Sequence, residues 1–197
     1  MKKRASEASF AVLTIGHSTR TLKDFITLLR EYGVQKVVDI RTIPRSRHNP
    51  QFNCEELPNS LKAVGIGYVH MLGLGGLRHS APDSQNTGWR NLSFRGFADY
   101  MQKEEFEKSL GVLMEQAKAE EVVLMCAEAV PWRCHRSLIA DALSIRGVRV
   151  EHILSPTSLQ VHKVTPWAEV DGTHITYPLK EPRSNRTHPL SKVERSG

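Results

Sequence analysis

Short apolar runs and amphipathic segments alternate over residues 10–154, and this alternation constrains the fold of the chain more than any other feature. The apolar runs, rich in β-branched residues, read as buried strands at 10–18, 36–40, 67–72, 121–126 and 148–154. The segments between them carry apolar residues at helical spacing, at 21–33, 54–65, 97–120 (one helix or two in succession) and 134–147. We therefore expect strands and helices to follow one another in strict alternation.

Buried parallel strands joined by helices form an open sheet with helices on both faces, because right-handed crossovers return over the sheet. The sequence predicts a Rossmann-like, three-layer α/β domain with a mostly parallel sheet of about five strands. The first helix has the clearest ends. Thr21 and Asp24 have the spacing of a capping box with an acid in place of the usual Glu or Gln, and Gly33 suits a left-handed C-terminal residue.

The pattern changes after Ser155. Asp171-Gly172 lies between two extended-looking runs, which is a strong short-range signal for a hairpin. The last residues have almost no apolar content, and we expect a disordered basic tail that is solvated rather than bound to nucleic acid. The expected organisation is an α/β domain at 1–154, a C-terminal extension with a short hairpin at 155–178, and the tail at 179–197.

Composition limits the location and the partners. Three cysteines without a CxxC pair predict free thiols in a reducing compartment and therefore a cytoplasmic protein. The N-terminal segment lacks the apolar region of a signal peptide, and no apolar run reaches membrane-spanning length, so no membrane contact is expected. A formal charge of +6 favours a phosphate-bearing ligand, a nucleotide or nucleic acid. No cofactor is predicted, and the oligomeric state stays open.

Polar and reactive side chains gather where the predicted strands end. Ligands of an open parallel sheet bind beyond the carboxyl ends of its strands, so residues that follow different strands are expected to meet there. Together with the start of the last helix, these positions hold His17, Ser18, Asp39, Arg41, Arg45, Ser46, Arg47, His70, Cys126, Glu128, Cys134, His135 and Arg136.

The two neighbouring cysteines are expected to differ. Cys134 is the stronger candidate for a reactive thiol, because a helix start and the adjacent Arg133, His135 and Arg136 would lower its pKa. His135 cannot be assumed to be its base, since consecutive residues of a helix point about 100° apart, and the partner could be another residue. For Cys126, packing and chemistry have equal weight, and burial at a strand end predicts the slower thiol.

The loop 41–52 is the clearest candidate for anion recognition, because arginines and a serine lie on a proline-stiffened segment and the guanidinium fork suits phosphate. A buried Asp39 would need a partner, and Arg41 would point to the same face. A salt bridge that only fixes the loop and an Arg41 oriented for substrate have equal weight. Glu128 is read either as solvated or as a base or nucleophile held ionised by an arginine.

A metal site is a further alternative, with Cys126, Cys134 and His135 as ligands and His17 or His70 in addition. The spacing C-x7-C-H matches no common zinc motif, so no metal ligands are predicted.

Four motifs in order, "IGHS", "DIRTIPRSR", "YVHMLGLGG" and "CAEAVPWRCHR", resemble the family called domain of unknown function 488. The resemblance covers roughly residues 12 to 154 and implies a shared fold and site rather than a known reaction. The positions to which it points are His17, Ser18, Asp39, Arg41, Pro44, Ser46, Arg47, Tyr68, Gly75, Gly76, Cys126, Glu128, Pro131, Cys134, His135 and Arg136.

Two classes of function are compatible with these observations. The preferred one is an enzyme, a hydrolase or transferase, on a nucleotide or nucleic-acid substrate. Its candidate catalytic residues are Cys126, Glu128, Cys134, His135 and His17. Its candidate substrate-binding residues are Ser18, Asp39, Arg41, Arg45, Ser46, Arg47, Tyr68 and Arg136. The alternative is a non-catalytic module that binds nucleic acid or senses redox state through its cysteines.

Overall fold

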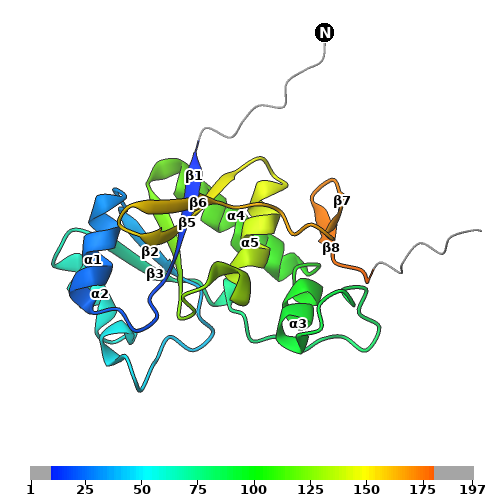
Figure 1. Cartoon of the computed structure of the whole chain (residues 1–197), viewed down its shortest axis with the longest axis horizontal. Helices are drawn as coiled ribbons and strands as arrows, with labels where there is room; N and C mark the ends of the chain where they lie inside the picture. Colours follow the sequence, from blue (N-terminus) through cyan, green and yellow to red (C-terminus); the bar gives the residue numbers. More distant parts are fainter. Residues whose placement is uncertain (1–9, 180–197) are drawn as a thin grey trace, which may run out of the picture.

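The computed structural model describes residues 10–179, in which strands and helices alternate as the sequence predicts (Figure 1). The helices are α1 (Leu22–Glu31), α2 (Leu57–Lys62), α3 (Leu92–Tyr100), α4 (Glu104–Ala119) and α5 (Arg136–Ser144). The strands are β1 (Ala11–Gly16), β2 (Lys36–Asp39), β3 (Gly67–His70), β4 (Val122–Cys126), β5 (Arg149–Ser155), β6 (Ser158–Val161), β7 (Glu169–Asp171) and β8 (His174–Thr176). Short 3-10 turns lie at η1 (Pro50–Phe52), η2 (Leu72–Leu74) and η3 (Pro131–Arg133).

Six strands form one sheet in the order β3-β2-β4-β1-β5-β6. Strands β1 to β5 run parallel to their neighbours, and β6 pairs antiparallel with β5. The predicted α/β fold with a mostly parallel sheet is therefore confirmed. Sequence analysis missed β6 because this edge strand is short and its apolar residues, Leu159 and Val161, are 40% and 45% exposed.

The sheet is covered on both faces, as its sequence requires. Alternate residues of a strand face opposite sides, and Val37 packs with α1 and α2 in one core, whereas Val38 packs with α3, α4 and α5 in the other. The pattern repeats in β4, where Val123 and Leu124 lie in different cores. Strands that are apolar on both faces thus explain the three layers.

The ends of the helices follow local capping chemistry. The Thr21 hydroxyl accepts a hydrogen bond from the Asp24 amide at 3.1 Å, and Gly33 has a φ of 64°, as the capping signals predict. The segment 97–120 forms two helices, and the first starts earlier than expected, at Leu92. The reason is that the side chain of Asn91 accepts from the amides of the first turn and caps the helix.

The C-terminal extension contains the predicted hairpin of β7 and β8, with Gly172 at a φ of 59° in its turn. The extension is tied to α5 by Asp141, which is fully buried. Its carboxylate accepts from His162 Nε2 at 2.7 Å, from the Thr165 hydroxyl at 2.7 Å and from the Tyr177 hydroxyl at 2.9 Å. The predicted basic tail lies outside the described residues, apart from Leu179.

Among residues 10–179, no helix combines the length and the apolar character needed to cross a membrane.

Candidate functional site

The loops that follow β1 and β4 are joined at the carboxyl edge of the sheet. The amide of His17 donates to the Cys126 carbonyl at 2.9 Å, and the amide of Ser18 donates to the Ala127 carbonyl at 3.0 Å. These bonds continue the β1–β4 pairing beyond the strands and bring Ser18 into the left-handed region, at a φ of 47°. His17 is thereby held beside Cys126.

Arg136 fixes the loop that follows β4. Its guanidinium donates to the carbonyls of Glu128 at 2.5 Å and Ala129 at 2.8 Å, and the residue is only 1% exposed. Sequence analysis expected Arg136 to bind substrate. The structure instead buries it under the loop, because α5 begins at this residue and points it back toward the sheet.

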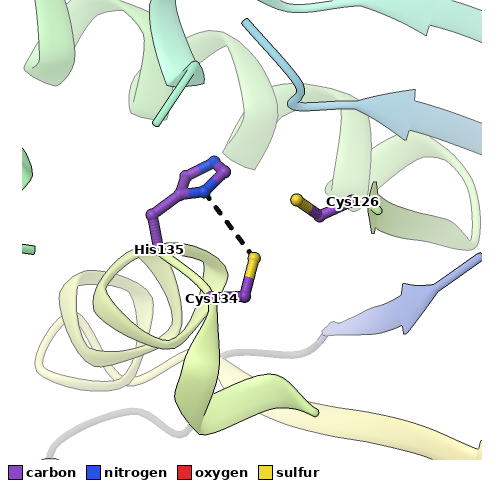
Figure 2. Close-up of side chains that lie close together, drawn as sticks. All are labelled: Cys126, Cys134 and His135. Carbon is purple, nitrogen blue, oxygen red and sulfur yellow. Dashed lines mark hydrogen bonds between the residues drawn. The ribbon is translucent and has the colours of Figure 1, made fainter. Parts of the chain in front are cut away.

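Cys126, Cys134 and His135 form a compact cluster (Figure 2). One ligand-type atom from each lies within 4.8 Å of the others. Cys126 is the last residue of β4, whereas Cys134 and His135 lie between η3 and α5. His135 Nδ1 is 3.6 Å from Cys134 Sγ, so the expectation that these two side chains diverge is wrong. Cys134 is not helical but extended, with φ −131° and ψ 143°, and the helical angle between neighbours does not apply.

The imidazole of His135 is oriented from two sides. Its Nε2 lies 3.1 Å from the Ile40 carbonyl, which can only accept, so Nε2 carries the proton and Nδ1 offers its lone pair to the sulfur atoms. Gly76 lies against the other side of the ring. A Cβ at Gly76 would fall 2.6 Å from His135 Cγ and closer still to Nδ1. In the "LGLGG" segment, Gly76 therefore allows the backbone to lie close to the imidazole of His135.

The two thiols of the cluster differ in acidity. The pKa of Cys126 is well below its usual value, chiefly because hydrogen bonding from the Cys134 thiol to its sulfur outweighs burial. The pKa of Cys134 is well above its usual value, because it is the donor and is buried. The expectation that Cys134 is the more acidic thiol is wrong, because its hydrogen bond to Cys126 and its burial outweigh the nearby Arg136, which acts in the opposite direction.

Asp39 and Arg41 form a buried ion pair next to the cluster. Arg41 Nη2 lies 2.6 Å from Asp39 Oδ2, and the side chains are 5% and 0% exposed. Tyr68 donates to the same carboxylate at 2.8 Å, while Arg41 Nη1 lies 3.3 Å from His17 Nε2. Both interpretations of this pair therefore have support: it is a salt bridge, and it orients Arg41 toward His17 at the wall of the cavity.

His17 is neutral in this arrangement. Burial lowers its pKa, and Nδ1 lies 2.9 Å from the Ser18 carbonyl, so Nδ1 carries the proton. Nε2 then accepts from Arg41. The ring stacks on Phe52 at a centroid distance of 4.3 Å, which fixes its plane.

The cluster opens into a cavity of about 450 Å³. The lining residues that the sequence predicted are His17, Arg41, Arg45, Ser46, Cys126, Glu128, Cys134 and His135. All five candidate catalytic residues thus meet in one cavity, as strand ends of a parallel sheet should.

Five predicted substrate-binding residues do not line this cavity: Ser18, Asp39, Arg47, Tyr68 and Arg136. Asp39, Tyr68 and Arg136 are occupied in the contacts described above, and Arg47 is exposed on the far part of its loop. The residue types alone do not show which of these side chains are taken up by contacts within the protein instead of lining the cavity.

Two arginines stand at the mouth of the cavity. Arg45 is 68% exposed and pairs with Glu55, which is itself 47% exposed. Such exposed pairs are weak, so Arg45 can exchange Glu55 for a bound anion. Arg133, from η3, is exposed and also lines the cavity. From the sequence, Arg133 was expected only to lower the pKa of Cys134.

Sequence analysis missed Asn91, Ser93 and Phe94, which close the cavity from the start of α3. The capping preference of Asn91 was the one available signal, and it points to a helix start rather than to a site. No rule of strand order places α3 at this edge.

Sulfur and imidazole nitrogen are donors suited to a metal ion. Within residues 10–179, Cys126, Cys134 and His135 are the one group of at least three His, Cys, Asp or Glu residues brought together closely enough for this.

Comparison with known proteins gives one match. A family model described as domain of unknown function DUF488 matches residues 21–143, which run from the start of α1 into α5 and include Arg41 and the whole cluster. Neither the curated proteins nor the solved structures contain a match.

Proposed function

This chain belongs to the DUF488 family, and on that premise we propose that it is an enzyme acting on a phosphate-bearing substrate, a nucleotide or a nucleic acid. The reaction class is hydrolysis or group transfer. The free thiols favour a reducing compartment such as the cytoplasm as its location.

One observation carries the proposal: a single cavity joins the Cys126–Cys134–His135 cluster to guanidinium groups at its mouth. Arg133 is exposed, and Arg45 can exchange its exposed pair with Glu55 for an anion. The planar guanidinium matches phosphate oxygens in pairs. The cluster lies deeper, where its two sulfur atoms are nearly excluded from water. A phosphate held at the mouth would therefore present the adjoining part of the substrate to the cluster.

Two further residues support chemistry at this position. Arg41 is held in one orientation by Asp39, so its guanidinium is a fixed hydrogen-bond donor at the wall of the cavity that can stabilise negative charge developing in a reaction. Glu128 is exposed at the rim of the same cavity and can exchange protons with solvent. The cavity thus combines a cysteine–histidine cluster for the reaction, arginines that bind an anion and a carboxylate that exchanges protons.

A redox-sensing module is the second candidate, and the proximity of the two thiols favours it. Oxidation by a peroxide would join Cys126 Sγ to Cys134 Sγ, with the peroxide taking up both protons and both electrons. The atoms already lie within 4.8 Å of one another. The arginine-lined cavity has no part in such a switch, and for that reason we rank it second.

The test is a screen of nucleoside mono-, di- and triphosphates and short oligonucleotides, with products identified by mass spectrometry. Wild-type protein should convert at least one compound, and Cys126→Ser should lower the rate by at least about 100-fold, the lower range for one positioned catalytic group. Cys54→Ser is the matched control, because Cys54 lies outside the cluster, and it should keep the rate. If wild-type protein converts no compound of the panel faster than Cys126→Ser does, the proposal is contradicted.

A further inference from the structure

We infer that Cys126, Cys134 and His135 bind one Zn²⁺ ion, with the fourth coordination position open to the arginine-lined cavity. This deepens the proposed function by naming a metal for the same centre. It rests on that function only for what the fourth position binds, because the three ligands can hold the ion without any substrate.

The geometry of the donor atoms fits a tetrahedral zinc ion. Bonds of about 2.3 Å to sulfur and 2.0–2.1 Å to nitrogen place tetrahedral ligand atoms roughly 3.5 to 3.8 Å apart. His135 Nδ1 and Cys134 Sγ are 3.6 Å apart, and all three donor atoms lie within 4.8 Å of one another. Closing the site therefore requires side-chain shifts of at most about 1 Å.

The donors come from two well-anchored segments (Figure 2). Cys126 ends a strand that is hydrogen-bonded on both sides, and Cys134 and His135 directly precede α5. Arg136 ties the connecting loop to α5 through two carbonyls. Ligands held in this way lose little freedom when the metal binds, which favours affinity.

The hydrogen bond made by the far nitrogen of His135 is the one expected of a metal-bound imidazole. A metal-bound imidazole normally donates its other N–H to a carbonyl or carboxylate, which fixes the tautomer. Here Nε2–H points to the Ile40 carbonyl, and Nδ1 is left as the free donor atom facing the sulfurs. Gly76 supplies the space that this ring position needs.

Charge also favours the ion. Two thiolates balance Zn²⁺, so the loaded centre is neutral, and the adjoining Arg41 is balanced by Asp39. Binding releases to solvent the thiol protons that the two sulfurs still carry, with no change in oxidation state. Thiolate and imidazole together select zinc over the harder ions Mg²⁺ and Ca²⁺.

The C-x7-C-H spacing is compatible with a metal site in this fold. Common zinc motifs place paired ligands two to four residues apart because both come from one short turn or hairpin. In this fold the first ligand comes from the end of β4 and the other two from the start of α5, so the loop length is free to differ. With three protein ligands and one open position, the site has the ligand count of a catalytic zinc. A phosphate oxygen or a water molecule could take that position.

The experiment starts with metal analysis of the full chain purified without chelator, followed by chelator treatment and titration with Zn²⁺ and with Co²⁺. We expect one equivalent of Zn²⁺ per chain and a Co²⁺ absorption spectrum typical of tetrahedral sulfur ligation. Cys126→Ser and Cys134→Ser should each weaken Zn²⁺ binding by more than the roughly 100-fold that loss of a second-shell partner produces. Cys54→Ser should bind as wild type does.

Wild-type protein provides a second readout that needs no variant to fold. Added Zn²⁺ should protect Cys126 and Cys134, but not Cys54, from alkylation, and a chelator should remove the protection. Unprotected cysteines, or reduced wild type that binds no more Zn²⁺ than Cys126→Ser, would overturn the inference. The double variant Arg45→Ala, Arg133→Ala should keep its zinc even if phosphate binding is lost, so failure of the metal site and failure of the proposed function are distinguishable.

Discussion

Gly76 lies so close to His135 that a methyl group on its Cα would fall 2.6 Å from the imidazole Cγ, inside van der Waals contact. The ring is in turn held by the Ile40 carbonyl on its Nε2 side. The position of the one nitrogen donor in the cluster thus depends on a residue that carries no chemistry.

Gly76→Ala should therefore displace the imidazole and disable the cluster. We expect loss of its hydrogen bond to Ile40 and a clear fall in Zn²⁺ affinity and in turnover, measured by titration and by the substrate screen. Gly111→Ala is the matched control, because a Cβ there meets nothing within 4 Å. In the interior of α4 it should stabilise the fold by about 0.5–1 kcal/mol. Wild-type zinc affinity in Gly76→Ala would contradict the assignment of His135.

The arginines at the cavity mouth should govern the salt dependence of binding. With a fluorescent single-stranded oligonucleotide, Arg45→Ala and Arg133→Ala should each reduce the slope of log K against log salt by about 0.7, the value for one phosphate contact. Fluorescence anisotropy between low and physiological salt measures the slope. Arg47→Ala removes the same charge from the same loop outside the cavity and should change the slope less. Equal effects of Arg45→Ala and Arg47→Ala would show a diffuse attraction instead of a site.

The buried ion pair should be costly to break. Asp39→Asn removes the counter-charge of the Arg41 guanidinium, which is only 5% exposed. Removal of one partner from such a buried pair costs about 4 kcal/mol. Urea denaturation of wild type and Asp39→Asn measures the difference in the free energy of unfolding. Glu55→Gln, which breaks the exposed pair with Arg45, should leave the midpoint almost unchanged. A similar midpoint for all three proteins would mean that Asp39 is not buried as described.

Several features of the site could be predicted from the sequence, and the reason is topological. Residues at the ends of β1, β2 and β4 meet because parallel strands end at one edge, so the convergence of His17, Arg41 and Cys126 follows from strand order. The pairing of Thr21 with Asp24 is similarly local. These features depend on periodicity and on short-range spacing, which a sequence contains.

Other features depend on tertiary contacts, which the sequence does not reveal. Arg136 turns inward to backbone carbonyls, and Cys134 is the hydrogen-bond donor to Cys126. Asn91 reached the cavity only through the placement of α3. In each case contacts between segments that are far apart in the sequence decided the outcome.

The buried His152 should make stability depend on pH. Burial lowers its pKa from 6.5 to about 4, so the folded state stays neutral while the unfolded state takes up a proton. The free energy of unfolding is therefore unaffected by His152 above pH 6.5 and falls as the pH drops toward 4. The total loss is about 3 kcal/mol, at about 1.36 kcal/mol per pKa unit. Denaturation of wild type and His152→Gln at pH 4.5 and 7.5 measures it. The fall in unfolding free energy should be smaller in the variant, and an equal fall would exclude His152 as the cause.

The most direct measurement is a crystal structure of the protein with a bound nucleoside monophosphate. We expect the phosphate to hydrogen-bond with Arg45 or Arg133 and the adjoining atoms to reach the Cys126–Cys134–His135 cluster within the 450 Å³ cavity. A nucleotide bound at full occupancy elsewhere on the molecule, with this cavity holding only solvent, would contradict the claim that phosphate recognition and the reactive cluster share one site.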